Sequence, residues 1–314
     1  MGQFKMKLKL KCETYDINHP DGSDKVYKSI VLHNKLTVLL ISDPSAASNS
    51  AAMSVKFGSF DDPSDMQGLA HLIEHMVFSG STIDGGENDF KDFLGMHGGE
   101  VFANTEPEYM GFSFTIVKDH FNAALEMFAN MFNEPLMDIE RFKKEMKTLN
   151  SEFESNKYKD TSRMEQLFSH TSPVNHPFNR FTWGNNQSFS GHEPQALRDC
   201  ALKLFRSHFV GASMKLVIIG SEAVDELEDL VIVYFSNLKR WRKTNFVFPE
   251  YNDRLWKHGV SYTLESLEDA QKSEGSLCFF FKSKHWITSF TASVGHRYDP
   301  CWIGGNLGGG YSFA

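Results

Sequence analysis

The sequence predicts an α+β fold in which an antiparallel or mixed sheet carries helices packed on one face. Two observations predict it. Several short segments place apolar residues at every second position, which is typical of half-buried strands, and longer ones place them three and four positions apart, which is typical of amphipathic helices. The mixture of hairpins, helices and one later strand favours a layered domain that ends near residue 240.

Five strands are expected. The segments 27–32 and 36–42 are separated by His33, Asn34 and Lys35, so we interpret them as a hairpin. The other strands are two alternating segments and one short apolar run, at 51–57, 110–117 and 214–219.

Six helices are expected from apolar stripes and from the residues that end them. Gly98 and Gly99 terminate one helix, and Pro135 terminates the next. The expected helices span about 68–78, 87–96, 120–132, 138–157, 193–209 and 223–234.

Composition narrows the class of protein. Hydrophobic residues make up 41% and charged residues 23% of the 314 residues, which are ordinary globular values. The net charge of −8 argues against nucleic acid as a partner. No apolar run approaches the roughly 20 residues that span a bilayer, and the N-terminus lacks the apolar core of a signal peptide. A soluble cytoplasmic protein without a membrane partner is therefore expected.

Three parts are expected along the chain. Residues 1–25 are polar and are expected to form a flexible N-terminus, and residues 26–240 the main domain. Residues 241–314 are too short for a second domain of equal size, and their glycine-rich end is typical of a flexible tail. The four cysteines are far apart and form no CxxC pair, so a zinc ribbon is not expected.

The motif HLIEH at residues 71–75 contains the candidate metal-binding residues. On a helix, His71, Glu74 and His75 fall within about 100° of arc, and the neighbouring residues are apolar. Buried imidazole and carboxylate groups need polar partners, and a metal ion would serve all three. The alternative is that the two histidines are merely exposed or hydrogen-bonded within the core.

A catalytic zinc ion usually has three protein ligands and a water, so a third ligand is needed. The expected helix 138–157 offers Glu145 and Glu152, which are two turns apart on the same edge of its apolar stripe. Two carboxylates at a buried edge repel each other unless a positive group faces them. The pattern alone is equally consistent with a solvated acidic rim.

The motif resembles the inverted zinc motif of the pitrilysin-type metallopeptidases. The string GLAHLIEHMVFSGS at 68–81 and ENDF at 87–90 resemble the insulysin and nardilysin branch, and FTWGN at 181–185 is closest to nardilysin. Glu145 and Glu152 match the two distal glutamates of that branch. The resemblance covers about residues 25–250.

The resemblance implies a single pitrilysin-type peptidase domain that hydrolyses peptides with zinc-activated water. It implies one zinc ion per chain, with His71, His75 and Glu152 as its ligands. It further implies that Glu74 is the general base and that Glu145 orients the site.

The sequence also departs from the family. The strand that lines the substrate cleft in the family ends in Asn-Ala, whereas this chain has Phe102 and Ala103 as the matching substrate-binding residues. The acidic insertion of vertebrate nardilysins is absent.

Full members have about four homologous domains in two halves, and this chain resembles one domain and an incomplete remnant of the second. A C-terminal half-enzyme or a homologous chain is therefore an expected partner, besides peptide substrates. Two functions remain open: a zinc metalloendopeptidase, and a catalytically silent, zinc-containing fragment that binds peptides.

Overall fold

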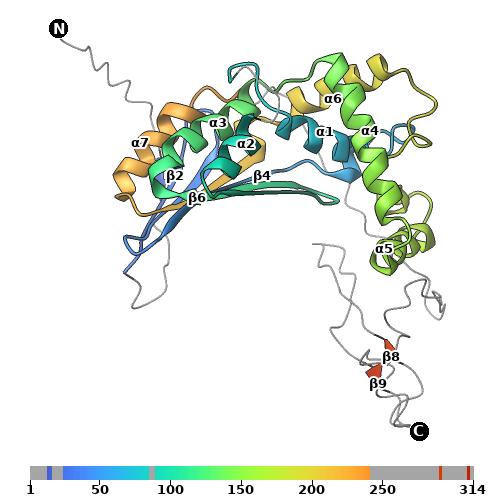
Figure 1. Ribbon diagram of the computed structural model, residues 1–314, viewed down its shortest axis with the longest axis horizontal. Coiled ribbons are helices and arrows are strands. Elements are labelled where there is room, and N and C mark those ends of the chain that lie inside the picture. Colours follow the sequence, from blue (N-terminus) through green and yellow to red (C-terminus); the bar gives the residue numbers. More distant parts are fainter. Residues whose placement is uncertain (1–12, 16–23, 85–88, 241–289, 292–309, 312–314) are drawn as a thin grey trace. The chain divides into compact units, whose positions relative to one another are not determined.

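The computed structural model describes residues 13–15, 24–84, 89–240, 290–291 and 310–311 (Figure 1). The chain divides into two units, the first comprising residues 1–151 and 181–245 and the second residues 152–180 and 246–314. The boundary between Ser151 and Glu152 falls within one continuous helix, α4 (Ile139–Asn156). The expected remnant at 241–314 lies outside the described residues, apart from a short antiparallel pair of strands, β8 (Phe290–Thr291) and β9 (Gly310–Tyr311).

The first unit is built on a seven-stranded sheet with the order β1-β2-β3-β7-β4-β6-β5. Only β3 and β7 pair in parallel, which confirms the expected mixed sheet. The strands are β1 (Glu13–Tyr15), β2 (Val26–Val31), β3 (Thr37–Ser42), β4 (Ser48–Val55), β5 (Glu100–Thr105), β6 (Met110–Val117) and β7 (Met214–Gly220).

The expected hairpin is confirmed as β2 and β3, and the three other expected strands as β4, β6 and β7. Strand β1 lies in the segment that was expected to be flexible, and it pairs with β2 through partners such as Tyr15 and Ser29. Three residues are too few to show an alternating pattern, so the sequence did not predict this strand.

Each expected helix is present with its bounds shifted by one or two residues: α1 (Leu69–Phe78), α2 (Asp89–Met96), α3 (Phe121–Asn133), α4, α6 (Pro194–His208) and α7 (Val224–Phe235). Short 3₁₀ turns occupy Ser59–Asp61, Lys118–His120, Pro177–Asn179 and Gly211–Ser213. Helix α5 (Asp160–Thr171) was not predicted, because Ser169 is its only buried residue and no buried apolar stripe marks it. Among the described residues, no helix has both the length and the apolar character to cross a membrane.

Helices α2, α3 and α7 lie on one face of the sheet, as expected (Figure 1). The core between these layers is rich in phenylalanine. The ring of Phe114 on β6 lies 5.4 Å from that of Phe90 on α2 and 5.1 Å from that of Phe128 on α3. Residues that alternate with Phe114, such as Ser113 and Thr115, point to the opposite face. This packing fixes the edge of the sheet against which α1 lies.

Candidate metal centre

Helix α1 is buried on every side except one. Seven of its ten residues are buried, and the three that remain half-buried are His71, Glu74 and His75. Strand β5, at the edge of the sheet, packs against this helix. The apolar residues of the motif therefore anchor α1, and its polar residues share one partly accessible face.

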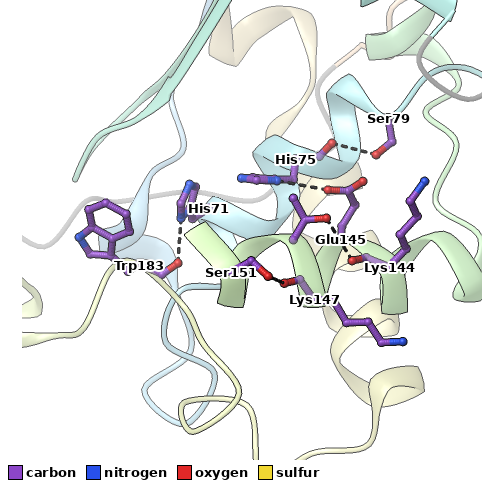
Figure 2. A network of polar contacts seen from close by, with 9 residues as sticks. His71, His75, Ser79, Lys144, Glu145, Lys147, Ser151 and Trp183 are labelled. Carbon is purple, nitrogen blue, oxygen red and sulfur yellow. Dashed lines mark hydrogen bonds and ion pairs between the residues drawn. The ribbon is translucent and has the colours of Figure 1, made fainter. Parts of the chain in front are cut away.

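Each of the two histidines uses its Nδ1 atom in a hydrogen bond (Figure 2). The Nδ1 of His71 lies 2.8 Å from the main-chain carbonyl of Trp183. The Nδ1 of His75 lies 3.2 Å from Oε2 of Glu145. Carbonyl and carboxylate oxygens only accept hydrogen bonds, so both Nδ1 atoms carry the proton and both Nε2 atoms present a lone pair.

Glu152 lies beside the two histidines and offers a carboxylate oxygen as a third ligand atom. One ligand atom from each of His71, His75 and Glu152 lies within 4.8 Å of the other two, and all three residues are half-buried. Glu152 lies two turns after Glu145 on the continuous helix α4. Two imidazole nitrogens and one carboxylate oxygen are a ligand set that suits zinc and leaves a fourth position for water.

Glu145 contacts His75 and lies outside the group of three. Burial is the largest influence on the pKa of Glu145 and raises it, but the hydrogen bond with His75 and the charge of Lys91 act against burial, and the pKa is lowered overall. The carboxylate therefore stays ionised beside His75 and orients its ring. The sequence pattern placed Glu145 and Glu152 on the same edge of a helix, and only the family resemblance implied different roles for them.

Glu74 is held apart from the other two polar residues of α1. Its Oε2 accepts a hydrogen bond of 2.6 Å from Oγ1 of Thr105, at the end of β5. Glu74 is thus tied to the edge strand rather than to the group of three. Nothing in the sequence pointed to Thr105, because a threonine near the end of a strand is common.

The two residues expected to contact substrate lie side by side on β5 but point in opposite directions. Phe102 is 65% exposed and pairs with Ser113, whose side chain lies on the face away from the helices. Ala103 is half-buried and pairs with Phe112 on the core face. No described strand pairs with the outer edge of β5. Its main chain is therefore open to pairing with another extended chain.

Both ends of α1 are held by side chains that the sequence analysis missed. The buried carboxylate of Asp62 accepts hydrogen bonds of 2.7 Å from the main-chain amides of Gly68 and Ala70. At the other end, Arg141 of α4 donates to the main-chain carbonyl of Ser79. A carboxylate at a helix N-terminus satisfies amides that have no partner within the helix and complements the helix dipole.

The chain is similar to known proteins in sequence and in structure. Residues 37–180 match the family described as Insulinase (Peptidase family M16). A nardilysin-like protein of Arabidopsis thaliana is 37% identical over 276 residues, which is 78% of this chain and 27% of that protein. The insulin-degrading enzyme of Mus musculus is 34% identical over 228 residues, which is 72% of this chain and 22% of the mouse enzyme. The chain thus spans about a quarter of the length of these relatives.

Two solved structures match this chain over most of its length. The crystal structure of pitrilysin matches with a TM-score of 0.70 and 28% identity, over 76% of this chain and 26% of that one. A protease from Helicobacter pylori matches with a TM-score of 0.62 over 71% of this chain and 53% of that one, and at 18% identity it supports the fold alone. The resemblance inferred from the motif is confirmed: residues 37–180 form a domain of the insulinase family of peptidases, peptidase family M16.

Proposed function

We propose that this chain binds one zinc ion through His71, His75 and Glu152 and acts as a metalloendopeptidase. One observation carries the proposal: a ring nitrogen of His71, a ring nitrogen of His75 and a carboxylate oxygen of Glu152 lie within 4.8 Å of one another, while Glu74 is hydrogen-bonded to Thr105. A purely structural polar cluster would not need a further carboxylate held beside the group by a hydrogen bond of its own.

The residues of the site would have separate roles in hydrolysis. Bound zinc would supply a Lewis acid that polarises a peptide carbonyl and lowers the pKa of a water toward about 7. Glu74 would accept the proton of that water, and the bond from Thr105 would hold its carboxylate in position. Glu145 would keep Nε2 of His75 directed at the metal.

The open edge of β5 supports an extended peptide as the substrate. A peptide could pair with this edge as an added strand, because main-chain hydrogen bonds would align it independently of its sequence. The exposed ring of Phe102 would then contact side chains on one side of the peptide. The mouse relative named above is by its name an insulin-degrading enzyme.

The ligand set is tested by elemental analysis. The purified chain should contain about one zinc per molecule, and Glu152→Gln should contain much less. Glu154→Gln is a matched control, since Glu154 lies on the same helix but pairs with Lys157 on the surface. Equal zinc in Glu152→Gln and the wild type would remove Glu152 from the ligand set.

The base is tested separately from the metal. Glu74→Gln keeps the shape of the side chain but cannot accept the proton, so zinc should be retained while peptide hydrolysis falls by about 10²-fold or more. Hydrolysis at the wild-type rate by this variant would refute the role of Glu74.

A second candidate is a zinc-containing chain that binds peptides without turnover. The coverage of 22–27% of the relatives favours it, because donors that stabilise the developing oxyanion in the whole relatives need not lie within the matched quarter. A peptidase assay with a chelator control, run beside a peptide-binding assay, distinguishes the two candidates. Binding without zinc-dependent hydrolysis would favour the second.

A further inference from the structure

The loop at residues 181–186, here called the clasp loop, contacts both helices of the candidate metal centre. We propose that it is a positioning element: it fixes the spacing of α1 and α4 and the tautomer of His71, and so sets the affinity of the site for zinc. This inference rests on the proposed zinc site.

Three contacts join the clasp loop to the start of α1. The main-chain amide of Phe181 donates to Oε1 of Gln67 at 2.8 Å. The carbonyl of Trp183 accepts from Nδ1 of His71 at 2.8 Å. Gly68 and Gly184 meet through their main chains, since a Cβ added to Gly68 would lie 2.2 Å from Cα of Gly184.

The same loop contacts α4 between its two glutamates. A Cβ added to Gly184 would lie 2.7 Å from Cδ2 of Leu149, which is buried. The main-chain amide of Asn186 donates to Oδ1 of Asn150 at 2.9 Å. Gly184 therefore approaches both Gly68, which directly precedes α1, and Leu149 of α4 so closely that no room remains for a side chain.

Glycine is required here for a second reason. Gly68 and Gly184 have φ angles of +91° and +73°, in the left-handed region that residues with a Cβ adopt at a cost. The partner of His71 is a main-chain carbonyl, whose position depends only on the path of the loop. The glycine that follows Trp183 thus controls where that oxygen lies, and with it which nitrogen of His71 faces the metal.

The experiment compares Gly184→Ala with Gly211→Ala. Alanine at 211 would also meet main chain, with its Cβ 2.4 Å from the carbonyl oxygen of Asn34, but it touches neither helix of the site. Zinc affinity is measured by competition with a chromophoric chelator, and unfolding of the metal-free proteins is measured in parallel. We expect Gly184→Ala to bind zinc about 10- to 100-fold more weakly. Gly211→Ala should keep nearly wild-type affinity even where its stability falls as far.

A second measurement reads the tautomer of His71 without any metal. In ¹⁵N-histidine spectra of the metal-free protein, assigned with His71→Ala, the wild type should show His71 protonated at Nδ1. Gly184→Ala should show a mixture of tautomers. Unchanged affinity and tautomer in Gly184→Ala, or equal loss of affinity in both glycine variants, would overturn the proposal.

Gln67→Ala keeps the proposal testable where Gly184→Ala does not fold, because it removes only the bond to Phe181 and one bond to Ser64. It should weaken zinc binding and broaden the His71 signal, and wild-type behaviour in both would count against the clasp loop. A wild-type chain that binds no zinc would refute the proposed function instead, while the tautomer measurement would still test the loop.

Discussion

Replacing Asp62 with asparagine tests whether a single buried carboxylate holds helix α1 in place. Both carboxylate oxygens of Asp62 are used, one on the amide of Gly68 and one on that of Ala70, each at 2.7 Å. Asparagine has only one acceptor oxygen, so its NH₂ group would face an amide that it cannot satisfy. The side chain is 3% exposed, so water cannot replace the lost bond.

The expected loss follows from these contacts. A hydrogen bond to a charged group contributes about 1.5–3 kcal/mol, and a negative charge at a helix N-terminus adds about 0.3–1 kcal/mol. We therefore expect the free energy of unfolding to fall by about 2–4 kcal/mol. With a urea m-value of about 3 kcal/mol per molar, the midpoint should fall by roughly 1 M.

The assay is urea unfolding of the metal-free protein, followed by far-ultraviolet circular dichroism. Asp65→Asn is the control, because Asp65 lies three residues later, its side chain is 66% exposed, and it pairs with His192 rather than with an amide of α1. If the two variants shift the midpoint equally, Asp62 does not hold α1 in the way described.

Two further predictions follow from other contacts. Burial lowers the pKa of His208 to about 4 from 6.5, so its protonation favours the unfolded chain: stability is complete above pH 6.5 and should fall by up to about 3 kcal/mol as the pH drops toward 4. Urea unfolding of metal-free protein across this range checks it, and His208→Gln should remove that part of the dependence. Thr105→Val should lower kcat/KM for peptide hydrolysis by about 10-fold at unchanged zinc content, because Glu74 loses the hydrogen bond from Thr105, whereas Thr105→Ser should not. Equal rates in the two Thr105 variants would contradict this role.

The parts of the site that could be predicted from sequence are those carried by side chains at regular spacing. His71, Glu74 and His75 fall on one face of a helix whatever the rest of the fold, and Glu145 and Glu152 do the same on α4. The helices and most strands were predicted for the same reason, since each buries one face.

The parts that could not be predicted depend on the main chain or on distant pairing. The carbonyl of Trp183 is chemically the same as every other carbonyl, so no residue type marks it as the partner of His71. Asp62 reaches α1 from outside the usual capping position, six residues before Gly68. Strand β5 was identified only through the family resemblance, because the residues on its core face, Val101, Ala103 and Thr105, form a weak apolar pattern.

The position of β7 in the sheet has a consequence for how the protein folds. Strands β3 and β4 follow each other in the chain, yet β7 lies between them, so residues near 42 must pair with residues near 220. Such non-local pairing slows folding, because closing the long loop between the strands costs entropy before the contacts between them can offset that cost. A nascent chain that has not yet reached residue 214 holds two separate half-sheets, and β3 and β4 each expose an edge that can capture another chain. Helix α1, which is synthesised early, therefore packs against a continuous sheet only after β7 has joined the two halves.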